Sequence, residues 1–362
     1  MNDPSSDNDN EQFVPDYSFI ELINSESSKL PWKAKAHDSF TNKTHGQMKK
    51  LIGMSKFKQI KYKISESKKS LLPSSSSLPK INFLQINFKE HFNLRSKGKM
   101  KRGSGALVFE PCDGNLENGL PKCFDWRNID KVNYDTPIKS QGDCGSCYAE
   151  AFISALESRI RIKSKLTAKP FLSTSNTISC SRTNQGCNGG YPWLVGRYGK
   201  NFGFVETTCN PLIETDKACD ETCYTRSRLW KIKNFGYIGK DYYGSTNEEA
   251  MMKELHENGP ITIAFNAAPD LYYYSYGVFI TNPKEAYSQG NDREDVKPWQ
   301  FTNHAVVCVG WGETNHEGQL LKYWIFKNSW GEEWGEGGYF RILRGINLGA
   351  VENQAVYAEP EL

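Results

Sequence analysis

The stretch QGDCGSCYAEAF, residues 141–152, decides the fold class of this 362-residue chain. It places Cys144 and Cys147 three residues apart, with a glycine two positions before each and an apolar run after them. Such a pair has three interpretations: a metal-binding pair, a redox-active pair, or a nucleophile with a structural cysteine beside it. The rest of the sequence has to choose between them.

The composition is that of a globular protein with a well-filled core. The net charge is +3 and aromatic residues make up 13% of the chain, so we expect no nucleic-acid partner on charge alone. No apolar run reaches 18 residues, and the polar start MNDPSSDNDNEQF has no apolar core. We therefore expect neither a transmembrane helix nor a signal peptide here.

The cysteines indicate an oxidising compartment. Ten are present, and five of them lie between Cys180 and Cys223 in a stretch rich in glycine, asparagine and threonine. This density is typical of a disulfide framework. We therefore expect the lysosome, the vacuole or the secretory pathway.

Composition and the spacing of apolar residues divide the chain into three parts. Residues 1–13 are polar and predict a disordered tail. Residues 14–119 hold two short helical patterns, FIELI with Phe19, Leu22 and Ile23, and HGQMKKLIG, followed by a Lys- and Ser-rich connector. The connector is either a solvated linker or a surface for an acidic partner or membrane. Residues 120–362 form the globular domain.

Within the globular domain the pattern changes from helix to strand. Phe152, Leu156 and Ile160 are spaced as one stripe of an amphipathic helix. Later segments, ITIAF, HAVVCVGWG, YWIFKNSWG and GYFRILRG, read as strands. A helical part followed by a run of strands predicts an α+β fold with two subdomains.

Neither the metal nor the redox interpretation finds support elsewhere in the chain. A structural zinc site needs a second tight ligand pair, and Cys219 and Cys223 have no matching histidines. A thioredoxin-like pair follows a strand in a βαβ unit, whereas the strands of this chain come later. We therefore expect no metal.

The nucleophile interpretation is supported by three further residues. Cys147 enters the predicted helix at its N-terminus, where the partial positive charge stabilises a thiolate. His304 begins an apolar strand and would serve as the base, Asn328 would orient it, and the amide of Gln141 would join the Cys147 N–H in holding an oxyanion. Taken singly, His304 could be a strand-edge histidine and Asn328 a turn residue.

These motifs together resemble the papain-family cysteine proteases, from residue 120 to the C-terminus. The resemblance implies a papain-like fold, with a helical subdomain carrying the catalytic helix and an antiparallel β-barrel subdomain. It implies roles for Cys147, His304, Asn328 and Gln141 as nucleophile, base, orienting group and oxyanion donor. It also implies peptide or protein substrates bound along Gly189, Gly190 and Trp330. Glu150, an unusual acidic residue on the catalytic helix, is expected to be solvated.

The sequence resembles most closely the branch of this family that removes N-terminal dipeptides, weakly even before residue 120. This implies that residues 14–119 are an activation segment, with a second cleavage in SQGNDREDVKPW, residues 288–299. No counterpart of that branch's exclusion domain is visible, so a separate exclusion domain or an oligomer is an implied partner. A papain-like endopeptidase and a non-catalytic binding protein remain alternatives.

The same resemblance implies a disulfide pattern. The expected pairs are Cys144–Cys187, Cys180–Cys219 and Cys209–Cys223, and Cys112 and Cys123 have no counterparts and are left to pair with each other. Cys308, within an apolar run, is expected to be a buried free thiol.

No cofactor is expected, apart from a chloride ion that the resemblance implies near Tyr191, Trp193 and Tyr237. The alternative is that these three rings simply fill the core.

Overall fold

The computed structural model describes residues 9–25, 30–52, 116–117, 119–212, 215, 217–240, 242–281 and 302–362. The connector, the SQGNDREDVKPW segment and Cys112 lie outside these residues, and with them the suggested Cys112–Cys123 pair. The helices are α1 (Tyr17–Asn24), α2 (His45–Leu51), α3 (Cys147–Lys163), α4 (Thr174–Cys180), α5 (Pro192–Asn201), α6 (Cys223–Arg226) and α7 (Glu248–Asn258). The strands are β1 (Trp32–Ala34), β2 (Leu116–Glu117), β3 (Leu120–Pro121), β4 (Phe124–Asp125), β5 (Ile232–Tyr237), β6 (Ile261–Phe265), β7 (Tyr274–Phe279), β8 (His304–His316), β9 (Gln319–Lys327), β10 (Tyr339–Leu343) and β11 (Ala355–Pro360).

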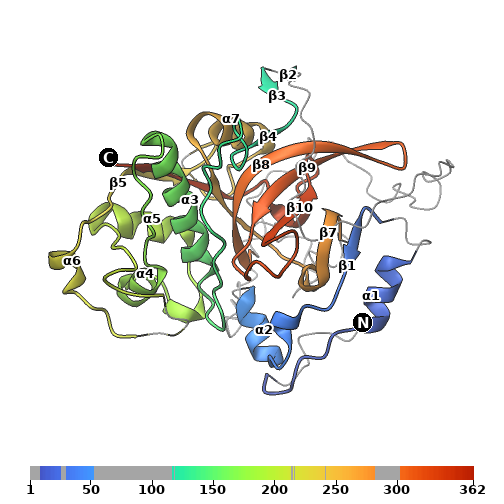
Figure 1. The fold of residues 1–362 in the computed structure, drawn as a ribbon, viewed down its shortest axis with the longest axis horizontal. Helices are drawn as coiled ribbons and strands as arrows, with labels where there is room; N and C mark the ends of the chain where they lie inside the picture. The colour runs from blue at the N-terminus through green and yellow to red at the C-terminus, as the bar shows by residue number, and fades with distance from the viewer. Residues whose placement is uncertain are drawn as a thin grey trace, which may run out of the picture.

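The molecule has a helical half and a strand half, which lie on opposite sides in Figure 1. Helices α3, α4 and α5 enclose one core, which includes Phe152, Leu156 and Phe204. The strands enclose a larger core with several buried tryptophans, among them Trp311 and Trp324. This arrangement is the α+β, two-subdomain architecture expected from the sequence.

The strand half is one curled sheet with the order β1-β7-β10-β9-β8-β6-β11-β5, and β4 pairs with β8 off this path. The described pairings are antiparallel except β7 with β10, which run parallel. The longest pairing is the β8–β9 hairpin, closed by a two-residue turn at Glu317 and Gly318. Both turn residues have positive φ, as the tightest hairpin turns require.

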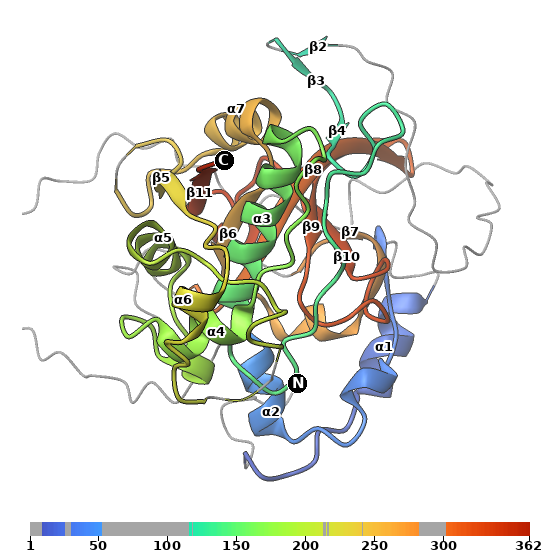
Figure 2. The same cartoon turned by 60° about the vertical axis from the view of Figure 1, so that its left-hand side comes forward.

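Helix α3 is the central contact between the two halves. It packs against β8 and β11 on one side and against α4 and α5 on the other, and it lies in front of the strands in Figure 2. Every residue from Cys147 to Ile160 is buried. The expected stripe of Phe152, Leu156 and Ile160 is therefore buried, but so is the face that the amphipathic pattern assigned to solvent.

The N-terminal segment packs on the strand half. Strand β1 pairs with β7, so residues before position 52 extend the edge of the main sheet. Gly277 on β7 allows this close approach, because a Cβ there would lie 2.2 Å from the Pro31 carbonyl oxygen. Trp32 is almost fully buried against Tyr274 and Phe279.

Helices α1 and α2 confirm the two short helical patterns, except that one residue of α1 is exposed. Met48 and Leu51 are buried, as is Ile23, but Leu22 is 60% exposed and does not share the apolar face.

The expected disordered tail does not extend over residues 9–13. Backbone hydrogen bonds join Phe13 to Lys43 and Gly46 to Asp9, and the Phe13 ring packs against Tyr272 and Tyr273 of the core.

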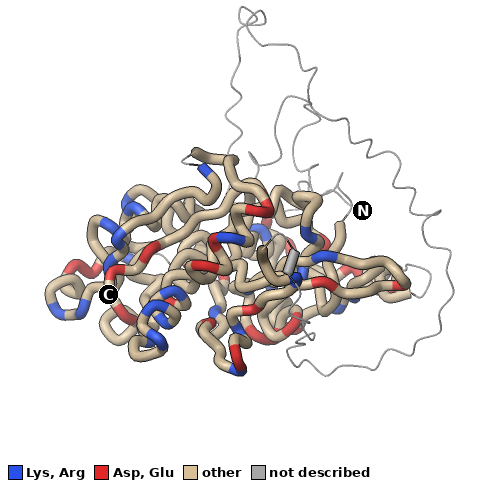
Figure 3. Tube along the Cα trace, turned by 90° about the horizontal axis from the view of Figure 1, so that it is seen from above, with Lys and Arg blue, Asp and Glu red and all other residues tan. Residues whose placement is uncertain are grey.

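Charged residues of both signs are interspersed over the described surface, as Figure 3 shows. No helix among the described residues is both long enough and apolar enough to cross a bilayer.

His37 is a buried titratable residue that joins the N-terminal segment to the strand half. Its Nε2 lies 2.8 Å from the Tyr274 carbonyl oxygen, and its ring contacts Phe40 and Trp334. Burial lowers the pKa of His37 to about 4, and the Lys35 ammonium adds to the effect, although the carbonyls of Tyr274 and Glu333 oppose it. In the released segment, the pKa of His37 would return to the usual value of about 6.5.

We therefore expect the attached form to lose stability as the pH falls from about 6.5 towards 4, because only the released form takes up the proton. The protection factors of the amides in residues 30–52, each corrected for the intrinsic exchange rate at the same pH, should be lower at pH 4.5 than at pH 7. His37→Gln keeps a donor for the Tyr274 carbonyl and should flatten this dependence. His45→Gln, in the same segment but only partly buried, is the control. An unchanged pH dependence in His37→Gln would show that other groups govern release.

Candidate active site

Cys147 is the first residue of α3, and the positive end of the helix dipole therefore lies at its thiol. It is 4% exposed and contacts Ala305 of β8. The structure leaves it as a free cysteine, whereas Cys144 is bonded to Cys187. The neighbouring cysteine is thus structural, which removes both the metal and the redox interpretation of the pair.

Gln141 is held from both sides of the site. Its backbone N–H donates to the Ser329 carbonyl at 2.9 Å, and its Oε1 accepts from the Ser329 hydroxyl at 2.6 Å. Its Nε2 donates one proton to the Cys144 carbonyl at 2.9 Å. A primary amide has two N–H donors, so one remains for an oxyanion near the α3 N-terminus. The role of Ser329 could not be predicted from its neighbours in the sequence, because its partner Gln141 is 188 residues away.

His304 and Asn328 meet because β8 and β9 pair. The register places Val307 opposite Lys327; His304 begins β8, and Asn328 directly follows the last residue of β9. His304 Nε2 lies 2.9 Å from Asn328 Oδ1, an acceptor, so the Nε2 carries the proton. Nδ1 then presents a lone pair, and within the part of the chain that the structure describes it has no hydrogen-bond partner.

Trp330 covers this histidine. The two rings stack at 5.0 Å with an angle of 30° between their planes. The indole is 3% exposed and its N–H donates to the Leu51 carbonyl at 3.1 Å. In this form Trp330 therefore contacts His304 and the N-terminal segment, where the sequence resemblance implied contact with substrate.

Burial keeps both reactive groups neutral in this form. It raises the pKa of the Cys147 thiol to about 11, against backbone hydrogen bonds from Ala305 and Tyr148 that lower it. It also lowers the pKa of His304 to about 4, against the hydrogen bond to Asn328. A thiolate–imidazolium pair needs the opposite shifts, so the covered site favours the uncharged thiol and imidazole.

The NGG segment, residues 188–190, packs directly beside the α3 N-terminus. The Gly145 N–H donates to the Cys187 carbonyl, and a Cβ on Gly190 would collide with the side chains of Asn184 and Tyr148. Gly189 has a φ of +106°, a backbone conformation that residues other than glycine rarely adopt. Gly189 and Gly190 thus lie beside Gly145 and Tyr148 at the start of α3, and their contact with substrate stays a prediction.

Tyr191, Trp193 and Tyr237 lie together. Trp193 stacks on Tyr237 with ring centroids 6.3 Å apart, and burial with the neighbouring Tyr243 raises the pKa of Tyr237 to about 12. The Tyr191 backbone N–H donates to Asn184 Oδ1 at 2.8 Å. One of the donors expected for chloride is therefore already used.

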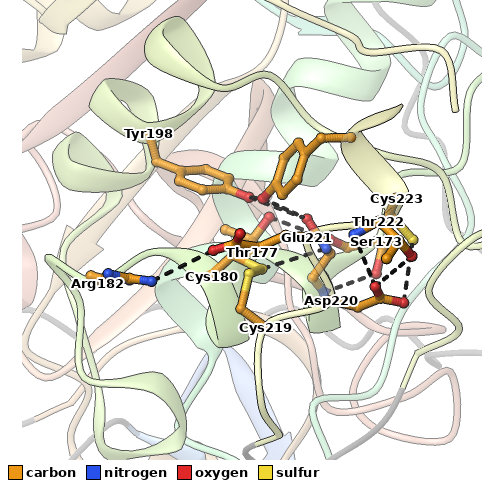
Figure 4. The surroundings of a disulfide bond; sticks show 12 residues. Ser173, Thr177, Cys180, Arg182, Tyr198, Cys219, Asp220, Glu221, Thr222 and Cys223 are labelled. Atoms are coloured by element: carbon orange, nitrogen blue, oxygen red, sulfur yellow. Dashed lines mark hydrogen bonds and ion pairs between the residues drawn. A yellow bond between two sulfur atoms is a disulfide. The ribbon is translucent and has the colours of Figure 1, made fainter. Parts of the chain in front are cut away.

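The helical half contains the three disulfides that the resemblance implied: Cys144–Cys187, Cys180–Cys219 and Cys209–Cys223. Figure 4 shows Cys180–Cys219 near Tyr198, which shares Asn176 as acceptor with Tyr224. Cys308 is a buried free thiol, and burial raises its pKa well above the usual range.

Glu150 corrects one expectation. It was expected to be solvated, but it is 6% exposed, and it accepts a hydrogen bond from the Thr174 hydroxyl at 2.8 Å. Helix α4 covers this face of α3, and the sequence of α3 alone could not reveal that cover.

Comparison with known proteins agrees with this geometry. A family model described as "Papain family cysteine protease" matches residues 120–359. The chain is 39% identical to "Cathepsin C" of Schistosoma mansoni over 68% of its length and 53% of that protein. It is 30% identical to "Dipeptidyl aminopeptidase 1" of Plasmodium falciparum over 67% of its length and 45% of that protein. The chain thus spans about half the length of these curated relatives.

The fold is similar to that of a solved precursor. The structure of "digestive procathepsin L 3" from Tenebrio molitor larval midgut superposes with a TM-score of 0.62 at 22% identity, covering 95% of this chain and 88% of that one. The match includes the region before residue 120, so the N-terminal segment is propeptide-like in its fold.

Because the N-terminal segment covers the site, we expect the Cys147 thiol to react slowly with alkylating reagents. Met48→Asp places a charge in the buried face of α2, so the segment should detach and expose the site. The rate of Cys147 alkylation by iodoacetamide at pH 7 should then rise at least about tenfold, because the thiol becomes less buried.

Leu22→Asp is the matched control, since Leu22 belongs to the same segment and is already exposed. Circular dichroism and peptide mapping of the labelled residue accompany both variants. Equal rates in Met48→Asp and the parent chain would mean that the segment does not cover the thiol.

Proposed function

Because the chain belongs to the papain family of cysteine proteases, we propose that Cys147 is its nucleophile and His304 its general base and acid. The supporting observation is the His304–Asn328 hydrogen bond of 2.9 Å, at the strand ends beside the α3 N-terminus. It fixes the tautomer so that the Nδ1 lone pair is available to the thiol proton. Asn328 is the orienting group, and a neutral amide suits an imidazolium that a thiolate already balances.

The reaction follows from these positions. His304 first takes the Cys147 proton, which forms a thiolate–imidazolium pair. The sulfur then attacks the carbonyl carbon, and the negative charge moves to the carbonyl oxygen. The Cys147 N–H and the remaining N–H of Gln141 stabilise that oxygen. When the C–N bond breaks, His304 gives its proton to the leaving amine and an acyl-enzyme remains. Water, deprotonated by His304, then releases the acid and restores the thiol.

We further propose that the substrates are peptides from which N-terminal dipeptides are removed. The support is the identity to "Cathepsin C" and "Dipeptidyl aminopeptidase 1", which the chain matches over about half of their length. Such specificity requires a group that binds the free amino end of the substrate. A separate exclusion domain or another subunit would supply it, and without that group the same site would act as an endopeptidase.

The N-terminal segment is proposed to be an activation segment, because residues 43–52 contact the loop and the tryptophan of the site. Lys43 and Gln47 both bind the Asp143 carboxylate, at 2.5 and 2.7 Å. The three disulfides support an oxidising compartment such as the lysosome, the vacuole or the secretory pathway. A chloride beside Tyr191, Trp193 and Tyr237 remains a proposal, now with Trp193 in the first turn of α5 as the backbone donor.

Replacement of the reactive groups should separate their roles. In chain freed of residues 1–119, Cys147→Ala should abolish peptide hydrolysis, and Gln141→Ala should lower kcat about 10²–10³-fold with a smaller change in KM. Activity is measured with a fluorogenic dipeptide amide, and folding by thermal unfolding. Turnover in Cys147→Ala at the parent rate would refute the mechanism.

Specificity is tested with paired substrates. Dipeptidyl amides with a free amino group should be hydrolysed at least about tenfold better, in kcat/KM, than the same substrates acetylated at that group, because a buried charged contact is lost. Mass spectrometry of a digested decapeptide should show successive losses of two residues. Faster cleavage of the acetylated substrate, or internal cuts, would indicate an endopeptidase instead.

A further inference from the structure

The buried Glu150 has no part in the reaction just described. It is three residues after Cys147 on α3, within the first turn of the helix. A carboxylate is favourable beside the positive end of a helix dipole, and the Thr174 hydroxyl of α4 donates to its Oε2. The position is therefore built to hold a carboxylate inside the protein.

Glu150 shares a cavity with the site. The cavity is small, about 10 Å³, which is close to the space that one water molecule requires. Its lining includes Asn328 and Ser329, which orient His304 and Gln141, and Ala305, the residue after the histidine. The carboxylate thus lies directly behind the groups that position the reacting atoms.

Other charges line or adjoin the same cavity. Lys139, from the loop before α3, pairs with Glu157 of α3 at 3.0 Å. Lys327 of β9 pairs with Asp135 at 3.1 Å, and all four side chains are almost completely buried. The neighbourhood of Cys147 and His304 therefore contains two ammonium groups and, with Glu150, three carboxylates. The low polarisability of a buried site strengthens the effect of each charge.

We propose that Glu150 sets the pH range of the reaction by placing a negative charge behind the Cys147–His304 pair. This inference rests on the proposed roles of those two residues. A negative charge disfavours the thiolate and favours the imidazolium, so it moves both limbs of the pH profile to higher pH. The Glu150 charge also contributes to the raised pKa of the Cys147 thiol.

Glu150→Gln is the test, because glutamine has nearly the same shape and can still accept from Thr174. In the full chain carrying Met48→Asp to uncover the site, both limbs of kcat/KM against pH should move to lower pH, by on the order of one unit. Glu150→Asp keeps the charge and should leave the limbs close to those of the parent. The pH dependence of Cys147 alkylation by iodoacetamide should shift in the same direction as the acidic limb.

The outcomes distinguish this inference from the proposed function. Limbs that do not move in Glu150→Gln, even if activity falls at every pH, would overturn the inference and leave Glu150 a packing residue. The same holds if Glu150→Asp shifts the limbs as much as Glu150→Gln. Absence of any Cys147-dependent hydrolysis in the parent would overturn the proposed function instead. The alkylation curves would still report the effect of the Glu150 charge on the thiol.

Discussion

The contact of helix α3 with strands β8 and β11 is the constraint on which the rest of the structure depends. It joins the two halves, and its first residue, Cys147, reaches the strand end where His304 begins. The helix is buried on every side, so its polar residues need partners inside the protein. Lys139–Glu157 and Lys327–Asp135 supply them, and Ser158 adds a hydrogen bond to Asp135. Buried ion pairs contribute little net stability, but removing one partner of such a pair is strongly destabilising. The main effect of the network is therefore to hold the helix in one position, and its net contribution to the free energy of folding is small.

Local pattern was sufficient to predict the elements that carry the site. The 3.6-residue spacing of apolar residues predicted α3, and short apolar segments predicted β6, β8, β9 and β10. These signals are local, because each element buries apolar side chains that lie close together in the sequence. The geometry of the site depends on pairing over long distances. Ser329 and Gln141, which form a hydrogen bond, are 188 residues apart, and neither local sequence predicts the contact. The resemblance to known cysteine proteases supplied those links where periodicity could not.

The failures of prediction share one cause. Glu150 and Leu22 were judged from the sequence of a single helix, yet what covers a helix face comes from elsewhere in the chain. For Glu150 the cover is α4, whereas no residue in the described part of the chain buries Leu22, which is 60% exposed. Residues 9–13 were judged from composition, which describes what a segment can bury. Their order depends on backbone hydrogen bonds to residues 43–46 and on the packing of the single Phe13 ring against Tyr272 and Tyr273, and composition predicts neither.

Strand β1 has a consequence for the form that remains once the N-terminal segment has gone. The segment contributes an edge strand and one large side chain, Trp32, to the sheet of the domain it covers. Its departure would leave the N–H and C=O groups of β7 unpaired and the rings of Tyr274 and Phe279 open to water. Such an edge can accept any extended chain, including that of a second molecule. While the segment is in place, β1 therefore covers the edge of β7 and keeps it from pairing with another extended chain.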